Sequence, residues 1–181
     1  MISHNDYPEI KPKKKLIKQI YVWIIMLVFG RAFQAASRVD KGAKAEFDAM
    51  PADFMLDFYV MPNGPHMVVG KDDNGRIKYY GWNPAGKKIT LFMGIKHLEA
   101  GIKMFTFQES SCTAVARDRL EVDGDLPVAC GVLRIMDLLE VMLLPKIVTK
   151  LGVKRYPKWS QMSPLRKWAS RLLVYVRLTT G

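Results

Sequence analysis

The side chains that could take part in catalysis are few and scattered along the chain. The three histidines, His4, His66 and His97, fall in an N-terminal arm, beside a predicted turn and on a predicted helix. Nothing around them marks a nucleophile, a general base or a nucleophile elbow, so each is interpreted as a surface imidazole. The sequence therefore predicts a protein that is not an enzyme, with no catalytic residues.

The two cysteines, Cys112 and Cys130, fall in predicted helical segments rather than in disulfide-dense loops. Cys112 has serine and threonine neighbours but no histidine close to it in the sequence. Two reduced, packed thiols are favoured over a disulfide or a reactive pair, which is consistent with a cytoplasmic protein.

No pattern is typical of a metal or cofactor site. The run Asp72-Asp73-Asn74-Gly75 lacks the spaced ligands and closing glutamate of a calcium loop, and a hairpin turn explains it. No Cys or His cluster has zinc spacing, and no Gly-rich phosphate loop follows a strand. We therefore expect no metal and no cofactor.

Positive charge is concentrated at the C-terminal end. The formal net charge is +11, and residues 145–181 hold nine Lys or Arg and no Asp or Glu. The 49% hydrophobic and 25% charged residues are typical of a globular protein, and 181 residues suit one domain with extensions. The charge distribution predicts an anionic partner for the C-terminal segment.

Alternating apolar residues predict four successive strands. They cover Phe54 to Met61, His66 to Lys71, Arg76 to Trp82 and Lys88 to Met93. Asn-Gly steps between the first three favour hairpin turns. A helix from Ile95 to Phe105, with one apolar stripe, is expected after the fourth strand.

The segment from Arg117 to Pro145 is the most informative part of the sequence. Leu120 and Val122 alternate with charged residues as in a short strand, and Asp123-Gly124-Asp125 predicts a turn with a helix N-cap. Nearly every position from Leu126 to Leu144 is apolar. We expect a helix buried around most of its circumference. Its narrow polar stripe comprises Arg134, Asp137 and Glu140.

A strand ending in Val-x-Gly-Asp that leads into a deeply buried helix resembles the sterol carrier protein type 2 domain. The upstream elements also come in the order of that family, so the resemblance covers about residues 47–145. Within the family, the L-x-V-x-G-D strand end and the Met-Asp step before a Leu-rich helix are similar to small bacterial accessory factors of ubiquinone synthesis.

The resemblance implies an α+β fold in which a five-stranded, mostly antiparallel sheet and packed helices enclose a lipid-sized tunnel. Three segments follow: 1–46, a polar arm and a basic, apolar helix; 47–145, the lipid-binding domain; and 146–181, a basic extension with an amphipathic helix.

The apolar faces of the strands and helices predict one cavity or core between the sheet and the helices. Several methionines fall on its walls, where flexible thioethers suit an irregular apolar ligand but also serve as ordinary core filler. The residues predicted to bind lipid are Phe54, Phe58, Leu91, Leu98, Ile102, Phe105, Val132, Met136 and Leu139.

A helix is expected from Lys13 to Ala36. Its apolar stretch between Lys18 and Arg31 is 12 residues, short of the ~20 that span a bilayer, and Arg31 argues against a cleaved signal peptide. Two alternatives remain for this helix: it lies in a membrane interface, or it packs on the sheet or in a partner's groove.

A second terminal helix, basic and amphipathic, is expected from Ser163 to Leu178, with Ser163 as N-cap and Pro164 at the first helical position. Basic and aromatic side chains on both terminal helices are predicted to contact an anionic membrane. These residues are Lys13, Lys14, Lys15, Trp23, Arg166, Lys167, Trp168 and Arg171.

The sequence hypothesis is thus non-enzymatic binding or transfer of a hydrophobic lipid at the inner face of a membrane. The resemblance puts a prenylated quinone precursor ahead of a sterol, a hopanoid or an acyl chain. The alternative is a structural or accessory subunit of a membrane protein complex. Nucleic-acid binding is disfavoured, because no recognised module is present and the basic helix has an apolar face.

Overall fold

The computed structural model of the protein describes residues 15–106, 108–143 and 176. Within them ten elements follow one another along the chain. They are α1 (Leu16–Val39), α2 (Lys41–Ala49), β1 (Met55–Val60), β2 (His66–Lys71), β3 (Ile77–Gly81), β4 (Leu91–Ile95), α3 (Leu98–Phe105), α4 (Ser111–Ala116), β5 (Leu120–Gly124) and α5 (Leu126–Leu143).

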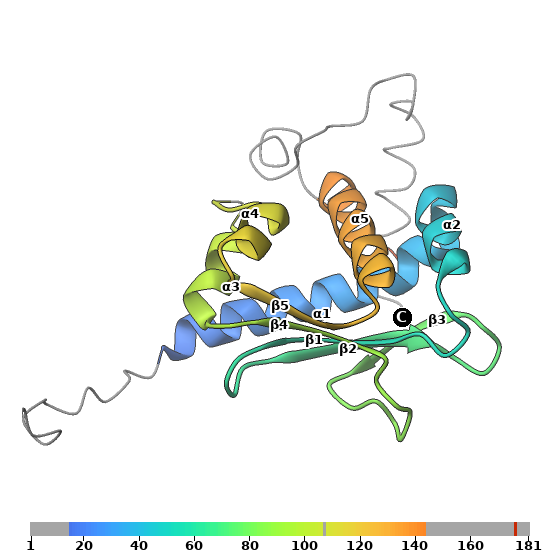
Figure 1. Ribbon diagram of the computed structural model, residues 1–181, viewed down its shortest axis with the longest axis horizontal. Helices are drawn as coiled ribbons and strands as arrows, with labels where there is room; N and C mark the ends of the chain where they lie inside the picture. Colours follow the sequence, from blue (N-terminus) through green and yellow to red (C-terminus); the bar gives the residue numbers. More distant parts are fainter. Residues whose placement is uncertain (1–14, 107, 144–175, 177–181) are drawn as a thin grey trace, which may run out of the picture.

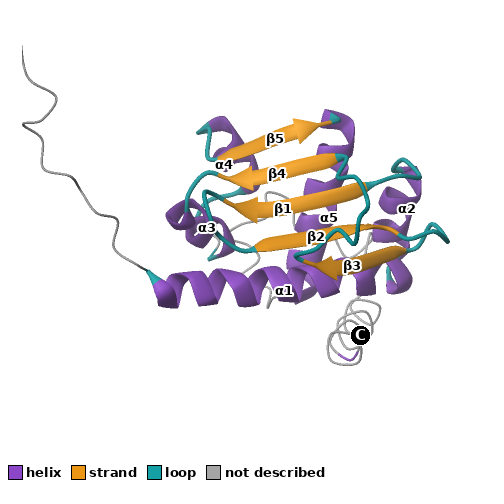
Figure 2. Ribbon diagram, turned by 90° about the horizontal axis from the view of Figure 1, so that it is seen from below, coloured by secondary structure: helices purple, strands orange, loops and turns teal. Residues whose placement is uncertain are grey.

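The strands form one sheet in the order β3-β2-β1-β4-β5. β1 and β4 are parallel, and the other three pairs are antiparallel. The described helices lie on one face of this sheet (Figure 1), and the opposite face has none over it (Figure 2). The expected fold, an α+β protein with a five-stranded, mostly antiparallel sheet, is confirmed.

Alternation along β1 separates the two faces as the sequence predicts. Leu56, Phe58 and Val60 are buried under the helices, whereas Asp57 and Tyr59 on the opposite face are partly exposed. Side chains that point toward the helices therefore form a single apolar layer.

The boundaries around the fourth strand differ from the prediction. β4 begins at Leu91 rather than Lys88 and includes Ile95, which the apolar spacing had assigned to the next helix. Ile95 pairs with both Val60 and Leu120 in the sheet, so its two neighbouring strands hold it in extended form. α3 then starts after His97, whose Nδ1 accepts a hydrogen bond from the Ala100 amide at 3.1 Å.

The expected turn at Asp123-Gly124-Asp125 is also wrong in part. Asp123 and Gly124 are still paired with β4, opposite Phe92 and Leu91, so the strand continues to Gly124. Gly124 has a φ of +133°, and a Cβ there would lie 2.7 Å from the Thr90 carbonyl oxygen. Only Asp125 separates the strand from α5.

α1 docks against the sheet through its second half. The Gln34 side chain accepts a hydrogen bond from the backbone N–H of Tyr79 at 2.8 Å, on the edge strand β3. Gly30 lets the Tyr79 ring approach, since a Cβ at Gly30 would lie 2.4 Å from it. Because Met26 and Phe33 belong to the same core as the sheet, the division at residue 46 does not separate two cores.

α2 closes the other end of the helical layer. Its N-cap, Asp40, accepts hydrogen bonds from the amides of Gly42 at 2.7 Å and Ala43 at 3.0 Å. Phe47 packs edge-on against Phe33, with ring centres 5.9 Å apart.

The cysteine prediction needs correction. Cys112 and Cys130 are free thiols, as expected, but both are exposed rather than packed. On α5 the buried positions include Ala129, Val132 and Met136, and Cys130 lies outside that stripe. The predicted helix from Ser163 to Leu178 lies outside the described residues, apart from Val176, which is helical and exposed.

Candidate functional site

The nine residues predicted to bind lipid meet in one hydrophobic cluster between the sheet and the helices. Seven are buried, and Leu98 and Ile102 are half-buried at its edge. The Phe105 ring joins two layers, because its centre lies 6.4 Å from Phe58 on β1 and 5.9 Å from Phe29 on α1. No residue of α1 was among the nine, although packing on the sheet was one of the two alternatives for this helix. Whether a lipid enters it stays a prediction.

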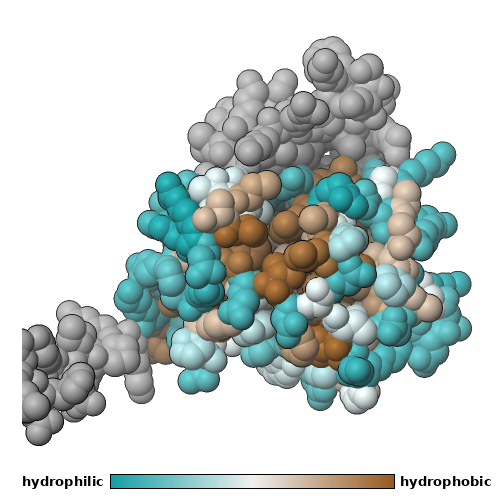
Figure 3. All heavy atoms as spheres, viewed as in Figure 1, coloured by the Kyte–Doolittle hydropathy of each residue, from teal (hydrophilic) through white to brown (hydrophobic). Residues whose placement is uncertain are grey.

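Apolar side chains reach the surface between α4 and α5, as Figure 3 shows from the side of Figure 1. A small cavity of about 10 Å³, room for about one water, lies between α3, the start of α4 and α5. Apolar and polar groups both line it. They are Met104, Phe105, Glu109, Ser110, Ser111, Met136 and Glu140.

Glu140 is the unusual member of this lining. Its side chain comes from α5 and is only 8% exposed, yet it has no hydrogen bond or ion pair in the described chain. Burial raises the pKa of its carboxyl to about 8, and the negative charge of Asp137, one turn earlier, adds to the shift. At neutral pH the group is therefore mostly protonated and can donate a hydrogen bond.

Glu109, on the opposite wall, is in a different state. It is also buried, but Arg117 donates to its Oε1 at 2.9 Å and Arg119 donates to its Oε2. Burial raises the pKa of Glu109, and the hydrogen bonds and charges of the two arginines outweigh it, so the net pKa lies below the usual value. The cavity thus has one satisfied carboxylate and one carboxyl without a partner.

This arrangement suits a ligand with an apolar body and a hydrogen-bonding end. The buried thioethers of Met104 and Met136 can change rotamer to fit it, and Glu140 offers the polar contact. From its spacing, Glu140 was predicted to lie in a polar stripe with Arg134 and Asp137. Arg134 does face outward and pairs with Glu46 at 2.9 and 2.8 Å, but the stripe runs inward at Glu140.

The two described histidines, His66 and His97, contact neighbouring side chains or the backbone of the fold. His66 lies on the helix-free face of the sheet, where its Nδ1 is 3.1 Å from the Asp57 carboxylate and its ring stacks on Tyr59. His97 is the cap of α3. Within residues 15–106 and 108–143 there is no group of three or more His, Cys, Asp or Glu side chains that could hold a metal ion.

Two of the predicted membrane-contact residues lie in the described chain, and both are on the first half of α1. The Lys15 side chain pairs with Glu99 of α3, as does that of Lys18 at 2.8 Å. Trp23 is 41% exposed and lies beside Trp82, with ring centres 6.4 Å apart. The others, Lys13, Lys14, Arg166, Lys167, Trp168 and Arg171, lie outside the described residues.

By length and composition, α1 is the one helix in the described chain that could span a membrane. The expectation from the sequence had counted only the 12 residues between Lys18 and Arg31, whereas a longer window of α1 that includes a charged residue is still apolar enough. A third of its most apolar window is buried within the protein, where the helix packs on the sheet. A core helix passes the same length and composition test, so this result does not decide between packing and membrane contact.

The solved structures that resemble this chain include the following three. The UbiJ-SCP2 ubiquinone synthesis protein has a TM-score of 0.45 and 14% identity, over 68% of this chain and 99% of its own. The sterol carrier protein domain 2 of Helicoverpa armigera has a TM-score of 0.43 and 16% identity, over 72% of this chain and 94% of its own. Sterol Carrier Protein 2 Like 2 of Aedes aegypti has a TM-score of 0.37 and 10% identity, over 64% of this chain and 98% of its own.

These are proteins of the kind that the sequence resembles. No protein-family model matches the sequence, and no curated protein matches it. At identities of 10% to 16%, the ligand and role of this chain have to be argued from its own residues.

Proposed function

We propose that this protein is a non-enzymatic carrier that binds a hydrophobic lipid between its sheet and its helices. The observation that carries the proposal is Glu140, a buried carboxyl at the edge of the apolar cluster that has no partner among the described residues. A buried polar group without a hydrogen bond costs ~1–3 kcal/mol, so a polar ligand group that meets it accounts for its presence.

The energy of binding would come from burial of hydrocarbon, at ~25 cal/mol per Å² of apolar surface. The cavity beside Glu140 has room for about one water, so the lipid must displace side chains to enter. Met104 and Met136 line the cavity and are the side chains best able to move.

The protonated Glu140 carboxyl suits a carbonyl or hydroxyl oxygen on the lipid. A prenylated quinone precursor combines such an oxygen with a long apolar chain, and the sequence resemblance favours this ligand over a sterol, a hopanoid or an acyl chain.

The same proposal places the protein on the cytoplasmic face of an anionic membrane. Ile17 and Ile20 on the first half of α1 are exposed, next to Lys15 and Lys18. Each Lys or Arg near an anionic leaflet contributes ~1 kcal/mol, and the C-terminal segment carries nine. Changing Arg166, Lys167 and Arg171 together to glutamate should move the protein from anionic liposomes to the supernatant in flotation assays.

The lipid site is tested with Met136→Trp, which fills the space between α3 and α5. It should abolish uptake of a fluorescent lipid while circular dichroism still shows the fold. Val115→Trp adds the same ring at an exposed position of α4 and should leave uptake unchanged. Undiminished uptake by Met136→Trp would count against the site.

The proposed hydrogen bond between Glu140 and the polar end of the lipid is tested by comparing two substitutions of Glu140. Glu140→Gln keeps a donor and should retain uptake, whereas Glu140→Leu should lose it and yet be more stable to urea. The folded-state pKa of about 8 lies above the ordinary glutamate pKa of 4.5, so wild-type stability should fall as pH rises from about 4.5 to about 8. Glu140→Leu should lack that fall. Equal uptake by both variants would remove Glu140 from the site.

A second candidate function is that of an accessory subunit in a membrane protein complex. The exposed apolar half of α1 favours it, because such a surface also suits a protein groove. Co-purified lipid in native mass spectrometry of the isolated chain would favour the carrier. Isolated chain that is free of lipid and self-associates would favour the subunit.

A further inference from the structure

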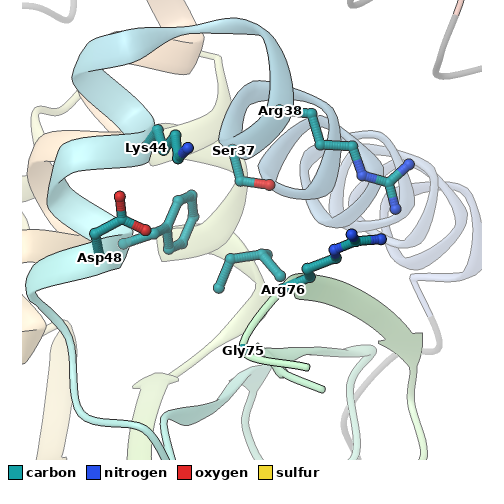
Figure 4. Close-up of a pocket in the computed structure, with 8 residues that line it drawn as sticks. Ser37, Arg38, Lys44, Asp48, Gly75 and Arg76 are labelled. Atoms are coloured by element: carbon teal, nitrogen blue, oxygen red, sulfur yellow. The ribbon is translucent and has the colours of Figure 1, made fainter. Parts of the chain in front are cut away.

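A second, more open pocket lies at the opposite end of α1 from its exposed apolar half. It is formed by the last turn of α1, by α2 and by the start of β3, and has a volume of about 470 Å³. Figure 4 shows Lys44 and Asp48 on its α2 side, Arg38 and Arg76 on the other, and Ser37 between them. It shares no lining residue with the cavity beside Glu140.

Within the described residues, the cations of this pocket have no acidic partner. Arg38, Lys44 and Arg76 make no ion pair or side-chain hydrogen bond in the described chain, and Asp48 is the only carboxylate in the lining. Three positive charges from three separate elements therefore surround the space, against one negative charge. The two guanidinium groups on one side, which have no partner among the described residues, present the planar donor forks that bind phosphate oxygens.

A neighbouring pocket shows that this charge imbalance is local. It has the same volume, about 470 Å³, and shares Gly75 with the first pocket. Its lining includes three lysines and three aspartates, so its charges balance. Two of those lysines are already used: Lys71 donates to the Met50 carbonyl at 2.6 Å, and Lys87 pairs with Asp73 at 2.8 Å.

The backbone that carries the cations is held in place. Asp40 caps α2 two residues after Arg38, and the Lys44 amide donates to the Asp40 carbonyl at 2.9 Å. In the hairpin, the Asp72 side chain accepts hydrogen bonds from the amides of Asn74 at 2.9 Å and Arg76 at 2.8 Å. The ligand would therefore order side chains only, which keeps the entropic cost of binding low.

The pocket floor is apolar, because Phe47 and Ile77 line it and are 2% and 4% exposed. Its volume falls within the ~300–1,000 Å³ typical of small-molecule sites. Both features suit a ligand with an organic part as well as an anionic group. We propose that Arg38, Lys44 and Arg76 form a binding site for a phosphate ester, with the phosphate on the arginines and the organic part over Phe47 and Ile77.

A phosphate ester could come from a soluble metabolite or from a phospholipid headgroup, and titration separates the two. The full chain is titrated with glycerol 3-phosphate by isothermal calorimetry. In parallel it is floated with phosphatidylcholine vesicles that contain either phosphatidic acid or phosphatidylserine, adjusted to equal surface potential. Saturable binding of glycerol 3-phosphate supports a soluble ligand. A preference for phosphatidic acid without such binding supports a headgroup.

Arg38→Gln and Arg76→Gln should each lower the affinity for whichever ligand binds, glycerol 3-phosphate or phosphatidic acid vesicles, about tenfold or more. This is the loss expected for a charge-assisted hydrogen bond. Lys88→Gln removes one exposed cation from the neighbouring pocket and should change nothing. As a measurement that needs no variant, inorganic phosphate should shift the NMR amide signals of residues 75–77. The proposal would be overturned if there were no glycerol 3-phosphate binding, no preference for phosphatidic acid and no NMR shift with inorganic phosphate. It would also be overturned if Lys88→Gln weakened binding as much as the arginine variants do. Lipid uptake at the Glu140 site should be unaffected either way.

Discussion

The first half of α1 is richer in large apolar residues than the second half, yet it is the more exposed of the two. In the first half, Ile17 is 85% exposed and Ile20 57%, and the fully buried side chains are Val22 and Met26. In the second half, Phe33 and Ala36 are completely buried against the sheet and α2. The first half is attached to the domain by the buried Val22 and Met26, and by ion pairs in which Lys15 and Lys18 meet Glu99 on α3.

The difference shows that an apolar helix stabilises a fold only where a complementary surface covers it. The second half has such a surface, since Gly30 and Gln34 fit the edge strand β3. The first half leaves several large apolar side chains in contact with water, which marks an interaction site rather than a core. Its side chains should therefore matter for association and little for folding.

The largest expected effect is on the buried half. Phe33→Ala should lower the free energy of unfolding by ~3–5 kcal/mol, because it removes a completely buried ring and leaves a cavity. Ile20→Ala, on the same helix, should cost less than ~0.5 kcal/mol. Urea unfolding followed by circular dichroism measures both. Similar losses for the two variants would show that both halves are part of the core.

A smaller effect is expected at the contact between α1 and β3. Gly30→Ala should destabilise by ~1–3 kcal/mol, because its Cβ would lie 2.4 Å from the Tyr79 ring. The control is Gly101→Ala on α3, where the nearest atoms would be 3.8 Å away. Alanine there should be neutral or stabilise by up to ~1 kcal/mol through helix propensity. Stabilisation by Gly30→Ala would mean that the helix does not approach β3 this closely.

Substitutions in the exposed first half of α1 should change membrane binding rather than stability. Ile17, Ile20 and Ile24 changed together to serine should leave the unfolding free energy within ~0.5 kcal/mol per site. The same variant should lose at least about tenfold in affinity for anionic vesicles, and the loss should persist at high salt because it is apolar. Flotation at low and high salt measures it. Unchanged flotation would assign this surface to a protein partner.

The smallest effect concerns the ion pairs that tie the first half to α3. Hydrogen bonds from Lys15 and Lys18 lower the pKa of Glu99 from its ordinary value of 4.5 to about 2. The attachment should therefore be present above about pH 4.5 and be lost as pH falls toward 2. Hydrogen exchange of residues 16–24 should rise over that range in the wild type and show no such pH dependence in Glu99→Gln. A Glu99→Gln variant with the wild-type profile would contradict the attachment.

Local sequence patterns predicted most of the secondary structure. Leu56, Phe58 and Val60 alternate with polar residues, and the apolar run from Leu126 is too long for a strand. Where the predicted secondary structure was wrong, pairing with a residue far away in the sequence determined the conformation. Ile95 fits a helical stripe, but Val60 and Leu120 hold it in the sheet.

The sequence by itself determined the strands, the helices, the apolar residues between them and the absence of a recognisable catalytic motif, because these depend on composition and on periods of two and 3.6 residues. Only the tertiary structure decided which half of α1 is buried, that Glu140 turns inward without a partner, and that Arg38, Lys44 and Arg76 meet around one pocket. Each depends on contacts between residues far apart in sequence, where burial and the distance between charges set the energy.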